Sequence, residues 1–481
     1  MDLSRDTTLT VGVRHQETNI DGYAIYGLPR FNNGMALDVP RSTNFTQGWN
    51  RHEASVDEIF TEFEHRFAGD WKAKLTATYG KTSIYQKLGR IRGAVNPAVG
   101  TTAFEPSYFM NREIPTYGID ANASGSFKAW GRTHQAMFGA NWSKSDELVR
   151  SATVAVPPGT SPVDIYNPNP WAIAEPTQPA WASQLLNKEE RIGLYGSTRW
   201  ELADDLHLLL GGRFSWFSYQ SKNVLTGALT NDYKQNAEFT PYAGLVYDLT
   251  KQWSLYTSYA DTFEPQSRYA TASGNLLKPA VGSNIEVGMK GELYDGRLNV
   301  AMSVFRAKKK NVAIVDQDNL GACPGISTNN CYRNSSFRDS RGFDIEVGGQ
   351  LATGWQATVG YTRLTNEDET GQSTAWETPK HLLRASTTYR LPGEWQKWTI
   401  GGGVAAQSDY RYQESSTALI TQGGYAVWNT FGSYKINDKW TGSLNVDNLF
   451  DKRYYSVVGG TRNGGYFGTP RSVMLTMRGS F

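Results

Sequence analysis

The stretch SVMLTMRGSF, residues 472–481, alternates apolar and polar side chains along its whole length. In an extended strand, one face would carry Val473, Leu475, Met477, Gly479 and Phe481, and the other Ser472, Met474, Thr476, Arg478 and Ser480. Successive side chains of a β-strand point to opposite faces, so this period of two predicts a strand between two different environments. Residues 253–259, 298–304 and 343–348 show the same period.

Roughly eighteen segments of the chain read as strands of this kind. They lie near 7–19, 53–67, 71–87, 116–129, 132–148, 187–202, 205–221, 234–249, 252–265, 283–294, 297–315, 337–351, 354–367, 380–391, 397–411, 424–436, 439–453 and 470–481. Many exceed ten residues, whereas the strands of a soluble sandwich are nearer five or six. The whole chain, residues 1–481, is therefore predicted to be one all-β domain.

The connections between these segments fall into two classes. Short polar turns lie at 68–70, 203–205, 249–251, 294–297 and 435–438, and long stretches rich in Pro, Gly, Asn and Ser lie near 20–52, 88–115, 150–184, 267–282, 318–336 and 455–469. Short turns at one end and long loops at the other are typical of a transmembrane antiparallel β-barrel of the bacterial outer-membrane type.

Composition agrees with a barrel. The 481 residues include 15 Trp and 26 Tyr, although the mean hydropathy is negative. An apolar outer face, a polar lumen and aromatic girdles explain both features. Trp71, Trp253 and Trp440 each follow a short turn, where a girdle position is expected. The sequence contains no run of about 18 apolar residues, which a membrane-spanning helix would need. The formal net charge of +2 gives no reason to expect a nucleic-acid partner.

Signals for enzymatic chemistry are missing from the sequence. The six histidines are scattered without metal-ligand spacing, and neither a phosphate-binding loop nor a nucleophile elbow occurs. We therefore expect neither an enzyme nor a cofactor. Cys323 and Cys331 are spaced to close a small exposed loop by a disulfide, although two unrelated thiols would give the same pattern. A metal site is less expected, because no second ligand pair lies nearby.

Two C-terminal motifs resemble the TonB-dependent outer-membrane receptors: NVDNLFDKRYY at 445–455, and YFGTPR at 466–471 before the last strand. Within that family, the chain looks like ferric-siderophore receptors of the coprogen/rhodotorulic acid and ferripyoverdine kind. The segments GLPRF at 27–31, YAGLVYD at 242–248 and TFEPQ at 262–266 carry this likeness, together with LKP at 277–279.

The resemblance implies a barrel of twenty-two strands preceded by a signal peptide, a TonB box and a plug domain. It places Met1 at the end of the fourth family strand, so about eighteen strands are expected here and the plug is expected to be absent. Two unpaired strand edges in lipid would cost on the order of tens of kcal/mol. Either the missing strands exist in the natural protein, or the remaining strands close as a smaller barrel.

The resemblance also implies a function. The expected protein is an outer-membrane receptor and transporter for a ferric siderophore of the hydroxamate type, energised through the TonB–ExbB–ExbD complex. The siderophore would carry the iron, so no protein ligand to the metal is expected. The barrel would be a monomer in contact with outer-membrane lipid and lipopolysaccharide. The alternatives are a transporter of another cargo such as cobalamin or a sugar, a passive porin-like channel, and a soluble all-β binding protein.

The siderophore should be held by aromatic side chains and by donors to its oxygens, in loops or on inward positions near the loops. The candidates are Tyr26, Phe31, Trp49, Arg51, Tyr108, Arg112, Trp181, Phe217 and Tyr219. Phe217 and Tyr219 share parity with Arg213, opposite Leu208 and Leu210, which places them on the lumen side. By resemblance, Trp49, Trp181 and Phe217 fall where similar receptors carry Trp. Each aromatic could instead pack loop against loop or belong to a girdle.

Overall fold

The computed structural model describes residues 2–320, 323, 330–335, 337–368, 371, 378–415, 417–462 and 464–480. Its long strands are β2 (Thr7–Asp21), β3 (Arg51–Arg66), β4 (Lys72–Ile91), β6 (Phe104–Ala129), β7 (Arg132–Val154), β9 (Ser183–Glu201), β10 (Leu206–Asn223), β11 (Leu229–Asp248), β12 (Trp253–Glu264), β13 (Ala280–Leu293), β14 (Leu298–Lys310), β17 (Arg338–Ala352), β18 (Trp355–Asp368), β19 (His381–Arg390), β20 (Trp398–Gln407), β23 (Tyr425–Lys435), β24 (Trp440–Asp447) and β27 (Ser472–Gly479).

Shorter elements accompany these strands. They are β1 (Asp2–Ser4), β5 (Thr101–Thr102), β8 (Val163–Asp164), β15 (Ala313–Leu320), β16 (Asn330–Asn334), β21 (Tyr410–Ser415), β22 (Ala418–Gln422), β25 (Tyr455–Val457), β26 (Tyr466–Phe467) and the 3-10 helix η1 (Gly393–Trp395). In the described part of the chain, no helix has the length and apolarity needed to cross a membrane.

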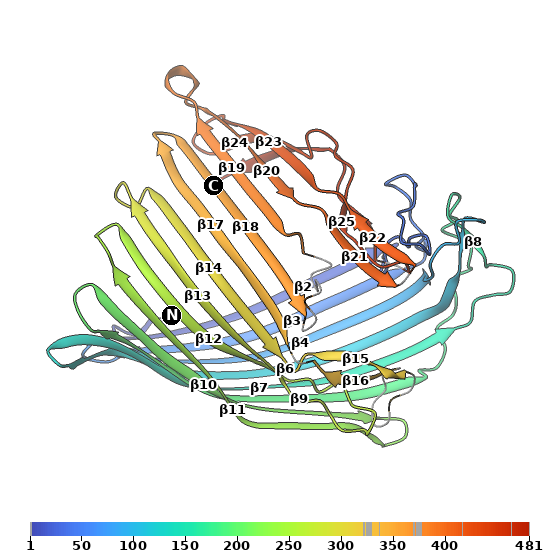
Figure 1. Cartoon of the computed structure of the whole chain (residues 1–481), viewed down its shortest axis with the longest axis horizontal. Helices are drawn as coiled ribbons and strands as arrows, with labels where there is room; N and C mark the ends of the chain where they lie inside the picture. The colour runs from blue at the N-terminus through green and yellow to red at the C-terminus, as the bar shows by residue number, and fades with distance from the viewer. Residues whose placement is uncertain are drawn as a thin grey trace.

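The eighteen long strands and β1 form one antiparallel sheet, in which each strand pairs with the next one along the chain. The sheet curls into a deep trough (Figure 1). The prediction of an all-β antiparallel architecture of about eighteen strands is confirmed. Among the described residues, no ladder joins β27 to β1 or β2, so the wall is open between these strands. The two edges approach each other at the loop end and diverge toward the short turns (Figure 1).

The two faces of the sheet differ as the alternation predicts. On the outer face, a row of exposed apolar side chains crosses neighbouring strands, with Phe63 opposite Leu75, and Leu194, Phe214 and Phe239 in register. The inner face is polar. There the Tyr195 hydroxyl donates to Asp120 at 3.0 Å, and Arg213 donates to Asn141 at 2.9 Å. An apolar outside and a polar inside are what a barrel wall in lipid requires.

The turn predicted at 294–297 shows why these connections are short. Tyr294, Asp295 and Gly296 have φ values of 54°, 59° and 79°, in the left-handed region. Such turns match the twist of the flanking strands and reverse the chain within a few residues. The short turns lie at one end of the trough and the long loops at the other (Figure 1).

Several strand boundaries differ from the predictions; β7, for example, extends to Val154 rather than 148, and β11 begins at Leu229 rather than near 234. Three further differences have a local cause. β6 begins at Phe104 rather than near residue 116, because Pro115 interrupts only its ladder with β7, which has no pairs between Glu113 and Thr116. The predicted strand 297–315 is divided at Asn311, whose φ is 59°. β24 ends at Asp447 instead of 453, because the Asn448 amide donates to the Lys452 and Thr469 carbonyls and closes a turn. The predicted terminal Phe481 lies outside the described residues.

The long loops build a hydrophobic core of their own at the loop end. Its buried members come from three loops and from the strand ends beside them: Leu28, Leu37, Val39, Phe45, Trp49, Ile91, Val95, Phe104, Val163, Ile165 and Ile173. Among the described residues, the inner face of the trough carries a smaller buried cluster of Phe217, Tyr219 and Tyr233. The larger core lies at the loop end, where its buried apolar contacts resist local opening.

Within this region the first long loop touches the last one, and we call residues 22–50 and 448–471 together the clasp. Leu28 and Gly465 form a two-way backbone bridge, and the Arg30 N–H donates to the Thr461 carbonyl at 2.8 Å. Arg41 pairs with Asp451 at 2.6 Å. The clasp therefore joins the loops that adjoin the two open edges of the sheet.

Arg30 is the buried centre of the clasp, with 2% of its surface exposed. Its guanidinium lies over the Tyr455 ring at 5.1 Å and donates to the Gly34 carbonyl at 3.2 Å. Burial lowers the pKa of this guanidinium, because the charged form loses hydration.

Candidate functional site

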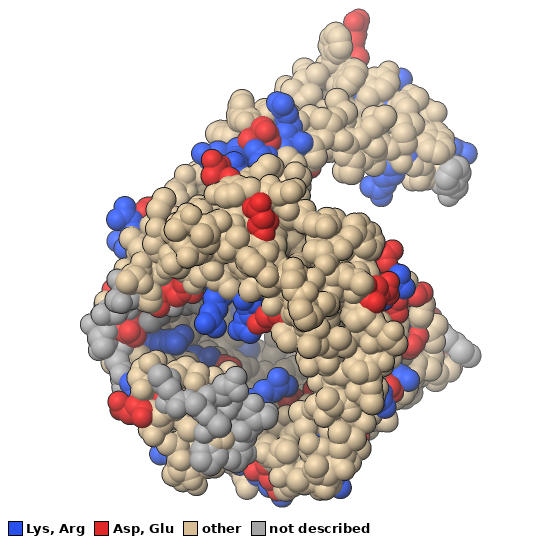
Figure 2. All heavy atoms as spheres, turned by 90° about the vertical axis from the view of Figure 1, so that its right-hand side faces the viewer, with Lys and Arg blue, Asp and Glu red and all other residues tan. Residues whose placement is uncertain are grey.

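The loop end of the trough is hollow. Figure 2 looks onto this end and shows Lys and Arg side chains gathered inside the hollow, with acidic side chains between them. A concave surface with converging charged groups is the usual setting for a ligand site. Two clusters on its wall contain most of the candidates from the sequence.

The first cluster is the tyrosine pair, Tyr26 and Tyr108, with Arg90 between them. The Arg90 guanidinium carbon lies 5.4 Å from the centre of the Tyr26 ring and 4.9 Å from that of Tyr108. Its Nε is 3.0 Å from a Glu105 carboxylate oxygen. Tyr26 comes from the loop after β2 and Tyr108 from β6, so Arg90 at the end of β4 holds two rings from separate elements in one place.

The second cluster, the wall cluster, is a polar network across β6, β7, β9 and β10. Arg112 donates through Nε to Glu147 at 2.8 Å, and the Asn187 amide donates to the other carboxylate oxygen at 3.0 Å. The Asn187 carbonyl oxygen in turn accepts from the Tyr219 hydroxyl at 3.1 Å and from Ser221 at 2.8 Å. The network fixes the Tyr219 hydroxyl and neutralises Arg112 in its resting arrangement.

Phe217 extends the wall cluster with an apolar surface. It packs with Tyr219 and Tyr233, and its ring centre is 5.8 Å from that of Tyr233. The Arg191 guanidinium lies 5.4 Å from the Phe217 ring. Phe217 and Tyr219 lie on the inner face, as their parity with Arg213 predicts. Cations, hydroxyls and aromatic faces thus meet in one region, which suits an organic anion.

The remaining candidates lie elsewhere. Trp49 is 5% exposed in the loop core, and its Nε1 donates to the Ile173 carbonyl at 2.9 Å, so its ring packs loop against loop and is not offered to a ligand. Phe31 packs against the same core. Arg51 is half-exposed and pairs with Asp21 at 3.3 Å. Trp181 is partly buried in the loop before β9. The structure brings none of these four into either cluster.

Several members of the clusters were not among the candidates from the sequence: Arg90, Glu105, Glu147, Asn187 and Tyr233. Arg90 and Glu105 are cross-strand partners in the ladder between β4 and β6. The prediction of one loop over residues 88–115 obscures that pairing. Glu147 and Asn187 are likewise partners between β7 and β9, at strand positions that could have been found by aligning the two alternating patterns.

Cys323 and Cys331 are joined by a disulfide, and the structure contains no free cysteine. Part of the predicted cysteine loop, residues 321–322 and 324–329, lies outside the described residues. Over the residues that are described, no group of three or more His, Cys, Asp or Glu side chains could hold a metal ion.

Comparison with known proteins identifies the class. The family described as "TonB dependent receptor-like, beta-barrel" matches residues 2–449. The chain therefore belongs to this family, whose members reside in the outer membrane of Gram-negative bacteria, and the predicted localisation is confirmed. Its relatives are receptors rather than enzymes, as predicted.

Individual relatives sharpen this picture. The chain is 34% identical to the ferric-pyoverdine M114 receptor of Pseudomonas sp. (strain M114), a match that covers all of this chain and 59% of the relative. It is 32% identical to the ferripyoverdine receptor of Pseudomonas aeruginosa PAO1, over 100% of this chain and 58% of that protein. The crystal structure of the outer-membrane ferripyoverdine receptor of P. aeruginosa bound to ferripyoverdine superposes with a TM-score of 0.90 and 30% identity, over all of this chain and 63% of that one. The chain thus spans less than two thirds of the length of these relatives.

Proposed function

We propose that this chain forms the barrel wall and outer vestibule of a TonB-dependent receptor for a ferric siderophore, with a ferric pyoverdine as its cargo. The observation that carries the proposal is the likeness to ferric-pyoverdine receptors, which extends over the whole chain at 30–34% identity in four relatives. A likeness confined to the wall would support the fold alone. This one includes the loops that surround the hollow.

The hollow at the loop end suits such a cargo. An iron chelate presents a bulky organic surface with oxygen acceptors, and aromatic faces and guanidinium groups bind both features. The tyrosine pair offers two rings around Arg90, and the wall cluster offers the aromatic surface of Phe217 and Tyr219 beside the Arg191 guanidinium. The siderophore would supply the iron ligands, so the protein needs only to recognise the outer surface of the chelate.

Recognition and transport are separate steps. Binding at the vestibule would concentrate the chelate, and the TonB–ExbB–ExbD complex would supply the energy to move it inward. Outer-membrane lipid and lipopolysaccharide would surround the apolar face of the wall, and we propose that the barrel acts as a monomer. A ferric hydroxamate, expected from the sequence, is the second candidate cargo, and the names of the relatives favour pyoverdine over it.

Growth under iron limitation tests the proposal. A host that lacks its own pyoverdine receptors would receive the gene, and purified ferric pyoverdine would be the only iron source. We expect growth that depends on the gene and on TonB, and growth that is lost in a Tyr26→Ala/Tyr108→Ala double variant. Val99→Ala, exposed in the loop before β5, is the matched control and should grow like the wild type.

Three outcomes would point elsewhere. Growth on a ferric hydroxamate but not on ferric pyoverdine would reassign the cargo. Growth on neither chelate, with uptake of cobalamin or a sugar, would reassign the substrate class. Steady large conductance in planar bilayers, with no dependence on TonB, would favour a passive channel.

A further inference from the structure

The loop between β12 and β13, residues 265–279, forms one side of the wall cluster, and we call it the Arg268 loop. Leu276 of this loop packs against Phe217, Tyr219 and Tyr233. Arg268 lies close enough to Tyr219 and Glu147 to interact with both electrostatically. The loop thus adds a cation and an apolar side chain to the wall cluster.

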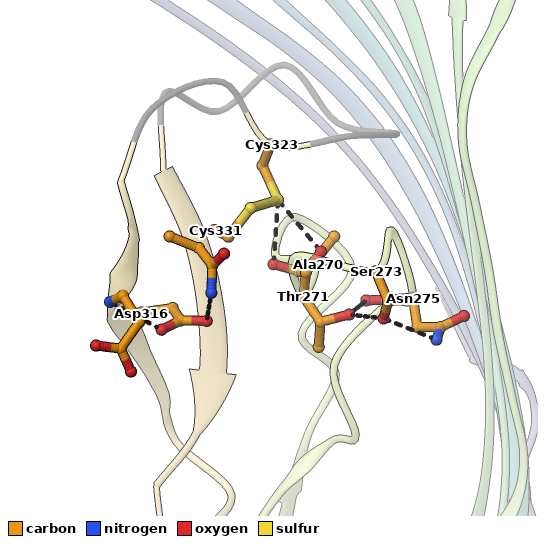
Figure 3. The surroundings of a disulfide bond; sticks show 9 residues. Ala270, Thr271, Ser273, Asn275, Asp316, Cys323 and Cys331 are labelled. Atoms are coloured by element: carbon orange, nitrogen blue, oxygen red, sulfur yellow. Dashed lines mark hydrogen bonds between the residues drawn. A yellow bond between two sulfur atoms is a disulfide. The ribbon is translucent and has the colours of Figure 1, made fainter.

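The tip of the Arg268 loop rests on the hairpin of β15 and β16, which the Cys323–Cys331 disulfide closes (Figure 3). The sulfur of Cys323 lies 3.5 Å from the Ala270 carbonyl oxygen and 3.3 Å from that of Thr271. Ala270 is completely buried. The Tyr332 N–H, next to Cys331 in β16, donates to the same Ala270 carbonyl at 2.8 Å.

Leu276 connects the two regions. It packs against the aromatic side chains of the wall cluster and also against the small cluster of Ala270, Cys323 and Cys331. A continuous series of contacts therefore runs from the disulfide to Tyr219. In Figure 3 the disulfide lies directly against the loop segment that carries Ala270 and Thr271.

The base of the loop is held in a different way. The Gln266 amide donates to the Asn311 carbonyl at 2.6 Å, and its carbonyl oxygen accepts from the Ala313 N–H at 2.7 Å. These bonds do not involve the disulfide. Loss of the disulfide should therefore loosen the tip of the loop and leave its base in place.

We propose that the Cys323–Cys331 disulfide is a positioning element of the ligand site, because it holds the tip of the Arg268 loop and so keeps Leu276 packed against the wall cluster and Arg268 near it. Without the bond, Cys323 would no longer be tied covalently to Cys331 in β16, and the larger conformational entropy of the reduced chain would oppose the contact of Cys323 with Ala270. The inference rests on the proposed function, since it concerns the site that would hold the siderophore.

Binding of ferric pyoverdine to whole cells measures how loss of the disulfide changes the affinity of the ligand site. The receptor, as its gene encodes it, would be compared with a Cys323→Ser/Cys331→Ser double variant, using ferric pyoverdine labelled with radioactive iron. If the loop holds its bound arrangement only about a tenth of the time in the variant, the apparent Kd rises about tenfold. Leu276→Ala, which retains the disulfide, should also weaken binding, whereas Val99→Ala should not. Heat-modifiable migration on a gel establishes that each variant has formed a barrel.

Hydrogen exchange of the purified receptors measures how often the Arg268 loop opens when no ligand is bound. We expect the amides of residues 265–279 to exchange faster in the double variant, while those of β12 and β13 stay unchanged. Unchanged exchange in the loop would overturn the proposal, and so would faster exchange with an unchanged Kd. A wild type that binds no ferric pyoverdine would refute the proposed function, and the exchange rates would still decide whether the disulfide holds the loop.

Discussion

Replacing Arg90 by alanine should separate the two rings of the tyrosine pair and weaken siderophore binding. The guanidinium of Arg90 lies 5.4 Å and 4.9 Å from the ring centres of Tyr26 and Tyr108. A cation over one ring contributes about 0.5–1 kcal/mol when exposed and about 2 kcal/mol when desolvated. The Arg90 side chain is 18% exposed, so two rings together give about 1–3 kcal/mol.

The effect on binding follows from this range. If all of that energy serves to order the two rings for the ligand, its loss raises the Kd about 5- to 150-fold. The carboxylate of Glu105 keeps a partner in the variant, because Arg92 lies 3.5 Å from it. The weaker binding of Arg90→Ala should therefore reflect the loss of stacking on the two rings and not an unpaired Glu105 carboxylate. Arg90→Lys keeps the charge but loses the planar stacking, and it should fall between the wild type and Arg90→Ala.

Titration of whole cells with labelled ferric pyoverdine gives the Kd of each variant. Arg92→Ala is the matched control, because Arg92 pairs with the same carboxylate but stacks on neither tyrosine, and its Kd should change less than about twofold. Equal Kd values for Arg90→Ala and the wild type would refute the reasoning. An equal loss in Arg92→Ala would show that charge, and not stacking, is what matters.

Three further outcomes follow from the structure. Tyr219→Phe removes the hydroxyl that bonds Asn187 and should cost about 0.5–1.5 kcal/mol in the same titration, less than Tyr219→Ala; equal losses would exclude a role for the ring. Leu210→Arg on the outer face should cost up to about 2–4 kcal/mol, the cost of a cation at the bilayer midplane, and should lower the fraction of heat-modifiable barrel, an effect that Leu210→Val should not share. The hydrogen bond from the Arg471 N–H lowers the pKa of Asp451 below its ordinary value of 3.8, so its contribution to the clasp is complete above that pH and is lost as the pH falls through the lower folded value; proteolysis of residues 22–50 should accelerate at about pH 2 but not at about pH 5.

The period of two predicted the wall well, because a strand between lipid and a polar interior must place each side chain on one defined side. The strand boundaries were predicted less well. Residues 88–115 were expected to form a loop, yet β6 begins at Phe104 and continues through Pro115, whose missing N–H affects only the ladder with β7. β24, in contrast, is shorter than predicted. Its apolar pattern continues beyond Asp447, but the hydrogen bond from the Asn448 side chain to the Lys452 carbonyl closes a turn there.

The candidate site was less accessible to sequence reasoning, because it depends on contacts between loops. Trp49 and Tyr26 look alike in the sequence, as aromatic residues of the same long loop. Trp49 is buried in the loop core, whereas Tyr26 stacks on Arg90. The difference arises from residues forty or more positions away, such as Gly89 and Ile173. Gly89 lies so close to Trp49 that an added Cβ would meet the indole ring at 2.8 Å. No local pattern encodes such an approach.

The clasp joins the loop end of the molecule, which we call the rim, across the two strand edges that stay unpaired below it among the described residues. The loops beside the first and last long strands are tied by the Arg41–Asp451 pair and the bridge of Leu28 and Gly465, while the strands below them separate toward the short turns (Figure 1). The gap between the two edges is therefore narrow at the rim and wide at the short turns (Figure 1). Any strand that completes the wall would enter a gap whose narrow end is already set.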